Sequence, residues 1–346
     1  MHVYSTAVFC SLFLVTACAS VGTEPLPGQP PHHVAGGFRN TDPEFRRPSS
    51  WTRWSFLARR LWASIIAPRT FEAPRVANDG AELRANIANP SVTWIGHSTL
   101  LLQMEGLNVL TDPQWGARAS PLSWAGPRRL SPPGVAFEHL PRIDIVLISH
   151  DHYDHLDLGT VKRLAEKHDP LFLVPLGLKA WFADNGIARV EELDWWQERG
   201  YRGVRYVCVP AQHFSGRTLW DSNKRLWASW VVLGRERRFY FSGDTGYFAG
   251  FKEIGKRLGP FDVAAVAIGA YLPPEMMKGV HTSPEEAVQA FIDLGARVLL
   301  GIHWGTFDLA DEPLDEPPAR MVAEIRRRGI HSERGWIFKL GETRRW

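Results

Sequence analysis

Short runs of Val, Leu, Ile and Phe recur through the chain from residue 92 onward, separated by glycine, proline and polar residues. Such runs are typical of buried strands, whereas the longer amphipathic stretches between them are typical of helices. The first half of this region predicts four strands and then a helix, at 92–95, 100–104, 107–110, 143–148 and 158–167. The second half predicts strands at 204–209, 227–233, 239–241 and 263–267, and helices at 284–294 and 317–328. Two β-sheets stacked face to face with helices outside would bury both apolar sets, although periodicity alone leaves other α/β architectures open.

A cluster of metal-ligating side chains follows the apolar run 143–149. The sequence there is His150-Asp151-His152-Tyr153-Asp154-His155. Imidazole nitrogens and carboxylate oxygens are the ligands that zinc takes where it keeps a position open to water, and an open position distinguishes catalytic from structural zinc. Because alternate side chains of one loop can diverge toward two ions, the cluster predicts a binuclear metal site at a strand end.

Three further candidate ligands, His213, Asp244 and His303, each follow a strand-like apolar run. Strand ends at one edge of a sheet can converge in space, so ligands scattered along the sequence can meet there. We expect two zinc ions that share a bridging hydroxide. The ligands divide into His150, His152 and His213 for the first ion, Asp154, His155 and His303 for the second, and Asp244 as a carboxylate that bridges the two.

The order H-x-H-x-D-H, followed by His, Asp and His, resembles the metallo-β-lactamase superfamily from about Val92 to the C-terminus. Within it, the chain resembles the N-acylphosphatidylethanolamine-hydrolysing phospholipase D family. The segments that carry this closer resemblance include Thr93 to Thr99, Leu110 to Pro113, Asp194-Trp195-Trp196, Gly243 to Tyr247 and Ile302-His303-Trp304-Gly305-Thr306-Phe307. The metal motif alone also occurs in lactamases, thioesterases, nucleases and lactonases, so these additional segments favour one branch.

The resemblance implies an αβ/βα sandwich of two stacked sheets and a zinc-dependent phosphodiesterase. The implied substrate is N-acylphosphatidylethanolamine, and the implied products are phosphatidic acid and an N-acylethanolamine. The resemblance also implies catalytic roles for Asp154 and for His281, which would position the substrate or donate a proton. A purely structural alternative exists for the segment around His281, because Thr282 or Ser283 can cap a helix that opens at Pro284.

Four other residues are candidates for supporting or substrate-binding roles. Asp112 could accept the outer N–H of a ligating histidine and so fix its tautomer, or it could be a turn aspartate before proline. His97 is a candidate for a similar supporting role. Tyr153 and Tyr271 are candidates for hydrogen bonds to the substrate, although packing explains each at least as well.

The N-terminus resembles a bacterial lipoprotein signal. Residues 8–14 form an apolar segment that is too short to span a bilayer but suits secretion. Val15-Thr16-Ala17-Cys18 resembles a lipobox, which predicts removal of residues 1–17, lipidation of Cys18 and, with Ala19 next, an outer-membrane lipoprotein that faces the periplasm. No Lys or Arg precedes the apolar segment, which departs from the usual signal.

The residues after this signal divide into two further segments before the hydrolase domain at 91–346. Residues 18–50 are rich in proline, glycine and polar residues, which predicts a linker. Residues 51–90 begin with aromatic and basic residues at roughly helical spacing, over 51–66. This stretch either packs on the catalytic domain or rests at a lipid interface beside the active site.

The composition is that of a globular enzyme, with 346 residues, 45% of them hydrophobic, and a formal net charge of +3. Lys and Arg are dispersed, so no nucleic-acid partner is expected, and Arg326 to Arg328 are interpreted as a solvated helix face. Cys208 lies in an apolar strand and is expected in the core. The expected partners are a phospholipid substrate and a membrane, and a homodimer is compatible with the sequence.

The leading hypothesis is a zinc-dependent lipoprotein phospholipase D. One alternative keeps the fold and the metals but hydrolyses a small substrate such as a lactone. Another is a metal-binding module of the cell envelope without catalysis. Asp194-Trp195-Trp196 and the expected lipid anchor favour a lipid substrate, and the intact ligand set argues against loss of catalysis.

Overall fold

The computed structural model describes residues 21–86, 88–218 and 220–346. The expected signal peptide, residues 1–17, and the expected lipidation site, Cys18, therefore lie outside the described residues. Within the described ranges, no helix is both long enough and apolar enough to cross a membrane.

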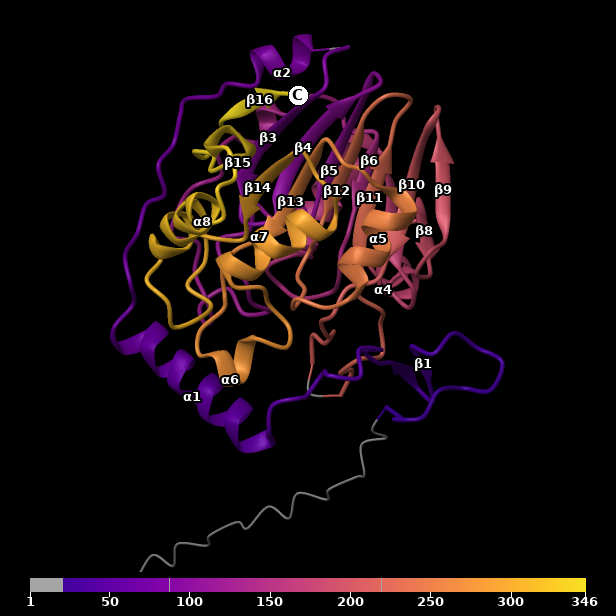
Figure 1. Ribbon diagram of the computed structural model, residues 1–346, viewed down its shortest axis with the longest axis vertical. Helices are drawn as coiled ribbons and strands as arrows, with labels where there is room; N and C mark the ends of the chain where they lie inside the picture. Colours follow the sequence, from indigo (N-terminus) through magenta and orange to yellow (C-terminus); the bar gives the residue numbers. More distant parts are fainter. Residues whose placement is uncertain (1–20, 87, 219) are drawn as a thin grey trace, which may run out of the picture.

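Two seven-stranded sheets stack in the centre of the molecule (Figure 1). The first sheet has the order β16 (Thr343–Arg345), β3 (Ser91–Gly96), β4 (Thr99–Met104), β5 (Leu107–Thr111), β6 (Ile145–Leu147), β7 (Leu171–Pro175) and β8 (Val190–Leu193). The second has the order β15 (Gly335–Trp336), β14 (Val298–Ile302), β13 (Val263–Ala267), β12 (Arg238–Phe241), β11 (Ser229–Leu233), β10 (Val204–Val209) and β9 (Glu198–Tyr201).

Each sheet changes from antiparallel to parallel pairing part-way across. In the first sheet, β16 to β5 pair antiparallel and β5 to β8 pair parallel. In the second, β9 to β12 pair antiparallel and β12 to β15 pair parallel. Parallel strands end at the same edge of their sheet, so the loops that follow β5 and β6 lie together, as do those that follow β12 and β14.

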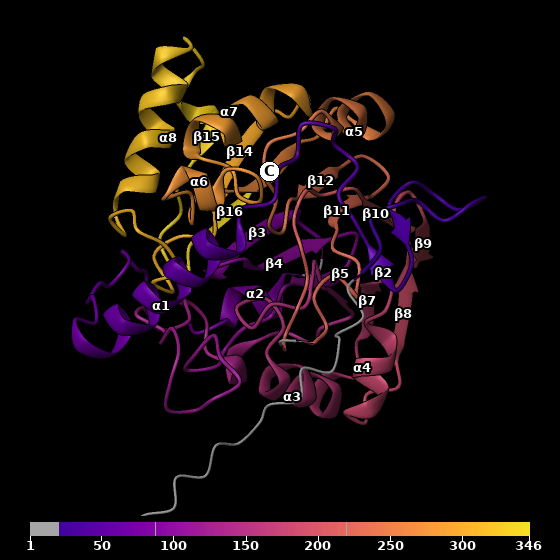
Figure 2. The same ribbon diagram turned by 90° about the horizontal axis from the view of Figure 1, so that it is seen from below.

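Helices cover the outer face of each sheet and complete four layers (Figure 2). The first sheet is covered by α3 (Leu158–His168) and α4 (Lys179–Asp184), and the second by α5 (Gly250–Leu258), α7 (Pro284–Asp293) and α8 (Glu316–Arg327). The predicted αβ/βα sandwich is confirmed.

Both faces of the first sheet are buried, which explains why its strands read as continuous apolar runs. Leu100 and Leu102 of β4 lie in a core that contains residues of both sheets. Leu101, between them, lies in a second core with Val161 and Leu164 of α3. Successive strand side chains point to opposite faces, so every residue of such a strand meets an apolar layer.

The remaining elements are short or lie at the periphery. They are β1 (His33–Val34), β2 (Gly37–Phe38), α1 (Ser50–Ile66), α2 (Ala81–Ala85), η1 (Phe137–His139), α6 (Pro274–Met277) and η2 (Ser332–Arg334). In Figure 1, α1 lies below the sheets beside α6, and the β1 hairpin lies on the same side of the molecule.

Residues 21–50, for which we expected a linker, lie against the hydrolase domain. Nε2 of His32 and Nε2 of His33 lie 2.6 Å and 2.8 Å from the carboxylate oxygens of Asp194. The side-chain amide of Asn40 donates to the backbone carbonyl of His213, and its oxygen accepts from the backbone N–H of His213. The described part of this segment is therefore attached at several points, in spite of its loop-like composition.

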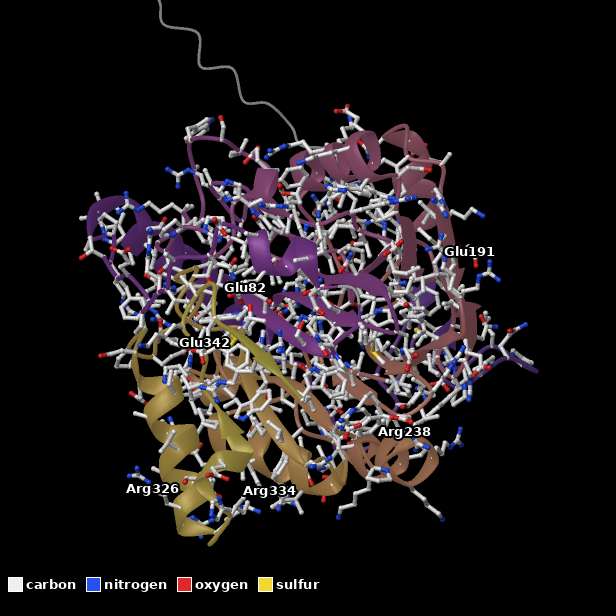
Figure 3. The ribbon with its side chains drawn as sticks, turned by 90° about the horizontal axis from the view of Figure 1, so that it is seen from above. Glu82, Glu191, Arg238, Arg326, Arg334 and Glu342 are labelled. Carbon is white, nitrogen blue, oxygen red and sulfur yellow. The ribbon has the colours of Figure 1, made fainter. Side chains whose placement is uncertain are left out.

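Of the elements in the two sheets and the helical layers, the sequence prediction lacks β7, β8, β9, β15, β16, α4 and α5. Strands β8 and β9 form the outer edges of the two sheets and carry charged residues such as Glu191 and Arg199, so no apolar run marks them. Arg326 and Arg327 are exposed at the end of α8, as the interpretation of a solvated face requires, and Arg326 points away from the molecule in Figure 3. Arg328 is half-buried and pairs with Glu324. Cys208 is buried in the core, as expected.

Candidate metal centre

The candidate ligands lie in loops that leave the ends of strands from both sheets. His150 to His155 follow β6, and Asp112 follows β5 directly. From the second sheet, Asp244 comes three residues after β12 ends at Phe241, and His303 follows β14 directly. The stacked sheets thus direct donors from widely separated parts of the sequence to one place.

The first group of donors consists of His150, His152 and His213. Nε2 of His150 lies 2.8 Å from Nδ1 of His152, and Nε2 of His213 lies 3.2 Å from the same atom. One ring nitrogen from each residue lies within 4.8 Å of the others, close enough for all three to contact a single ion. These are the residues that the sequence analysis assigned to the first ion.

The second group consists of Asp154, His155 and His303, with His97 as a fourth member. Oδ2 of Asp154 lies 3.3 Å from Nε2 of His155 and 3.5 Å from Nε2 of His303. The same oxygen lies 2.9 Å from Nε2 of His97. The sequence predicts a supporting role for His97. In the structure, the ring of His97 is in direct contact with Asp154.

Asp244 lies between the two groups. Its Oδ2 is 3.1 Å from Nε2 of His155 and 3.8 Å from Nε2 of His213, and its Oδ1 is 3.1 Å from Nε2 of His303. It therefore faces both groups, as a carboxylate that bridges two ions must.

Unpaired polar atoms at the centre test whether a metal fits these residues. Nε2 of His155, Nε2 of His303 and Oδ1 of Asp244 are buried and make no hydrogen bond to any described residue. Buried polar atoms are normally paired, and a cation placed between these nitrogens and this carboxylate oxygen would satisfy all three. The donor set of imidazoles and carboxylates fits divalent ions such as zinc.

The electrostatics of the centre divide its histidines into two sets. Burial and the neighbouring imidazoles hold the pKa of His150 well below its usual value, so its ring is neutral. Burial alone would raise the pKa of Asp244, but His155, His303 and His281 hold it well below its usual range. Burial alone would lower the pKa of His155 and of His303, but Asp244 and Asp154 hold the pKa of His155 well above its usual value and raise that of His303 to about 9. A metal ion must therefore displace the protons of these two rings when it binds.

Outer hydrogen bonds fix the orientation of the candidate ligands. Oδ2 of Asp112 lies 2.6 Å from Nδ1 of His155, so Asp112 lies where the expected supporting role requires. The same carboxylate accepts from the backbone N–H of Ser149. Nδ1 of His213 lies 2.8 Å from the carbonyl of Val280. Such partners hold a ligating ring in one tautomer and one direction.

His281 lies at the rim of the centre. Its Nδ1 is 3.9 Å from Oδ2 of Asp244 and makes no hydrogen bond among the described residues. Its ring also borders a cavity of about 240 Å³. Ser283 and Glu286 form a capping box at the start of α7. The helix cap that the structural alternative expected is therefore supplied by Ser283. The two interpretations therefore apply to neighbouring residues, not to the same one.

The two tyrosine candidates have protein partners. The hydroxyl of Tyr153 donates to the carbonyl of Arg217, whose guanidinium lies 3.9 Å from the centre of the tyrosine ring. The hydroxyl of Tyr271 donates to Glu316, although its ring borders the same cavity as His281. Both hydroxyls are already hydrogen-bonded to the protein, so either tyrosine would contact a substrate through its ring.

Two groups that organise the centre are missing from the sequence analysis. Asp151 is buried and accepts from the backbone N–H of Gly216 and from Arg225, which ties the first ligand loop to the loop after His213. Asn40 holds the backbone of His213, as described above. The position of Asp151 inside the ligand cluster was a signal for Asp151, but no pattern in the proline-rich segment marks Asn40.

Comparison with known proteins places this fold and this centre in a family. Residues 107–304 match the family model described as a beta-lactamase superfamily domain. The chain belongs to the metallo-β-lactamase superfamily. The matched range contains every candidate ligand from His150 to His303, so the superfamily assignment and the centre concern the same part of the molecule.

Members of the superfamily with clear sequence similarity include proteins from several kingdoms. The chain is 43% identical over 305 residues to the uncharacterized protein Rv0906 of Mycobacterium tuberculosis, covering 85% of this chain and 80% of that one. It is 46% identical over 244 residues to N-acyl-phosphatidylethanolamine-hydrolyzing phospholipase D 1 of Caenorhabditis elegans, covering 67% and 68%. It is also 43% identical over 97 residues to outer membrane protein RomA of Klebsiella pneumoniae, covering 28% and 71%.

Solved structures of the superfamily share the fold at lower identity. Igni18, a metallo hydrolase from Ignicoccus hospitalis, matches with a TM-score of 0.57 and 20% identity, covering 75% of this chain and 99% of that one. Its likeness extends to the fold alone.

The Asp112→Asn substitution should weaken metal binding. An asparagine side chain has one accepting oxygen in place of two, so it cannot serve both His155 and Ser149 as Asp112 does. We expect metal affinity to fall by about 10- to 100-fold. Titration against a competing chelator measures this change. Asp169→Asn, at an exposed carboxylate after α3, is the control, and equal affinities in all three proteins would exclude the supporting role.

The Gly243→Ala substitution should disturb the centre through the backbone. Gly243 has a φ of +55°, and a Cβ there would lie 2.4 Å from Cβ of Ser149, the residue before His150. We expect loss of metal binding, because Asp244 and His150 would be pushed apart. Gly329→Ala is the matched control, since Gly329 has a φ of +67° and open space around it. Metal content measured on both purified variants should fall only in the first.

Proposed function

We propose that this metallo-hydrolase of the β-lactamase fold hydrolyses N-acylphosphatidylethanolamine to phosphatidic acid and an N-acylethanolamine. The proposal depends mainly on the position of the Asp244 carboxylate, which faces both histidine groups. This position supports a site for two ions, and such sites suit the hydrolysis of phosphodiesters. The name of the worm relative supports the choice of substrate.

The residues at the centre would hold two zinc ions in the division predicted from the sequence. When bound, a pair of zinc ions lowers the pKa of water toward neutrality and stabilises negative charge on phosphoryl oxygens. Water would add to phosphorus and the bond from phosphorus to the ethanolamine oxygen would break, with one proton of the water passing to the departing oxygen and its hydroxyl remaining on the phosphate. Asp154 remains ionised and has its Oδ2 directed at His155 and His303, which suits it for the catalytic role expected of it.

His281 is proposed to act as a hydrogen-bond donor to the substrate. Burial lowers the pKa of His281 to about 4, so its ring is neutral at neutral pH and carries one N–H. A neutral ring at the rim can donate to a phosphoryl oxygen or to the departing ethanolamine oxygen without adding a charge to the crowded centre.

The cavity beside His281 has a mixed lining of charged and apolar side chains. Leu272 and Pro274 contribute apolar surface, and Lys278 and Glu286 contribute charges of opposite sign. Arg320 also lines the cavity, but its guanidinium is paired with Glu285 and Glu316. N-Acylation removes the amine charge of phosphatidylethanolamine, so the substrate has a net negative phosphodiester beside apolar chains. The apolar part of the lining supports a lipid over a small polar lactone, and Lys278 is placed to face the phosphodiester.

The proposed location is the outer membrane, through a lipid on Cys18. The name of the RomA relative supports this location, and the lipobox-like sequence supports the anchor. A lipid-anchored enzyme would meet its phospholipid substrate in the same membrane.

The substrate proposal is tested with the full chain carrying Cys18→Ser and loaded with zinc. N-Acylphosphatidylethanolamine, phosphatidylcholine and a sugar lactone are compared, with identification of products and metal content from one preparation. We expect phosphatidic acid and an N-acylethanolamine from the first substrate, and loss of turnover in His150→Ala and Asp244→Ala. Opening of the lactone alone, or inactivity with both ions bound, would contradict the proposal.

The His281→Ala substitution separates the role of His281 from the integrity of the metal centre. We expect kcat to fall about 100-fold or more with metal content unchanged, because only a substrate contact is removed. His281→Gln, which keeps an N–H donor, should recover part of this loss. Ser283→Ala is the control for the capping interpretation, since it should lower stability by about 1 kcal/mol without changing turnover. Near-wild-type kinetics in His281→Ala would contradict a contact between His281 and the substrate, and would leave His281 a structural role before α7.

A further inference from the structure

Helix α1 has its amphipathic faces reversed relative to a helix that packs on a globular core. Its large apolar residues Trp51, Trp54, Leu57, Leu61, Trp62 and Ile66 are exposed, with Trp51 81% and Trp62 67% accessible. Its inner face carries Arg60, which is half-buried, beside the buried ring of Phe56. Surface helices normally turn the apolar stripe inward, so this outward stripe requires an explanation.

Ionic and polar contacts hold α1 in this orientation. Arg60 pairs with the carboxylates of Asp308 and Asp311, and Arg59 lies 2.6 Å from Asp311. After the helix, Arg69 donates to the carbonyls of Asp311 and Glu312. The loop that receives these arginines begins just after the candidate ligand His303, so the helix is attached close to the centre.

Helix α1 also lies beside the entrance to the candidate site. Phe56 packs with Ala270, Met277 and Ala310. Met277 belongs to α6, whose first residue, Pro274, lines the cavity that His281 borders. Figure 1 shows α1 and α6 side by side below the sheets.

Other exposed apolar residues lie in loops that contact the same region. Leu122 and Trp124 are exposed in the loop 113–131, which pairs with the loop after His303 through Arg129 and Phe307. Trp220 is 62% accessible and follows Arg217, whose carbonyl accepts from Tyr153 in the first ligand loop. We call α1 together with Leu122, Trp124 and Trp220 the apolar rim.

The charge around the apolar rim is positive. The sequence from Phe45 to Phe71 contains no Asp or Glu. Arg59, Arg60 and Arg69 are paired with Asp308 and Asp311, so the positive charge of this segment comes from Arg46, Arg47 and Arg53, which have no carboxylate partner among the described residues. The sequence from Pro113 to Phe137 likewise contains no Asp or Glu and includes Arg118, Arg128 and Arg129. Basic residues beside exposed tryptophan and leucine are the composition of helices that lie in the interface of anionic membranes.

We propose that the apolar rim docks on an anionic lipid surface, with α1 lying in the interface and the candidate metal centre facing the membrane. The proposal deepens the proposed function and rests on it for the identity of the lipid drawn into the site. The charge complementarity of the rim with an anionic bilayer selects lipid as the occupant. A second copy of this chain, which would carry the same positive charge at the same face, fits it less well.

Vesicle binding tests the docking surface directly. The full chain with Cys18→Ser, which removes the expected anchor, is loaded with zinc and mixed with vesicles of phosphatidylcholine, with or without phosphatidylglycerol. We expect binding to the anionic vesicles that weakens as salt is added. The variant with Trp54→Ser, Leu57→Ser, Leu61→Ser and Trp62→Ser should bind at least about tenfold more weakly. The matched control carries Leu26→Ser, Val76→Ser and Ile292→Ser, at exposed apolar residues outside the rim.

Activity on two forms of the substrate separates docking from catalysis. The α1 variant should lose turnover on vesicles that contain N-acylphosphatidylethanolamine, yet keep it on a short-chain analogue dissolved as monomers. Vesicle binding by the wild type through α1, without hydrolysis of either form, would overturn the proposed function and leave the docking surface supported. Unchanged vesicle binding by the α1 variant would overturn docking whatever the activity. A stable dimer that this variant dissociates, without vesicle binding by the wild type, would assign the face to a second copy and also overturn docking.

Discussion

The buried carboxylate of Asp244 is the group on which the centre depends. A carboxylate removed from water is strongly destabilising unless opposite charges or donors compensate for it. Imidazoles from loops of both sheets surround Asp244. Two of them, His155 and His303, also have a buried ring nitrogen without a hydrogen-bond partner among the described residues. The convergence of β6, β12 and β14 on one point is therefore the structural condition for burying Asp244. Cations between these groups would complete the compensation.

The residues before the hydrolase domain form part of this arrangement. Asn40 holds the backbone of His213, and Trp227 of the domain donates to the same asparagine. Arg60 and Arg69 hold the loop after His303. Two ligand loops thus depend on contacts with the N-terminal segment, which makes the segment a component of the catalytic unit as well as a connection to it.

The same segment accounts for the unusual surface of the protein. Arginines of α1 face the carboxylates of the 308–312 loop, so the apolar residues of the helix are left outside. The buried candidate metal centre lies innermost, beside a cavity with a mixed charged and apolar lining, and the apolar rim lies at the surface. Each of these features suits a substrate that has an anionic phosphodiester joined to apolar chains.

The sequence by itself determined most of the central strands and the candidate ligands that the structure brings together, because strand periodicity and the His150 to His155 cluster are local patterns. Periodicity left other α/β architectures open, and the resemblance to a known superfamily selected the sandwich. The sequence also made Asp112 a candidate for a supporting role. Asp112 follows β5, which pairs parallel with β6, and this placement brings it beside His155. Only the tertiary structure decided that His97 contacts Asp154, that Asn40 holds His213, and that α1 turns its tryptophans outward. These depend on partners far along the chain, since Arg60 and Asp308 are 248 residues apart and Asn40 and His213 are 173 apart. A local sequence pattern indicates whether a side chain prefers apolar or polar surroundings. The distant residue that contacts this side chain is determined only when the whole chain has folded.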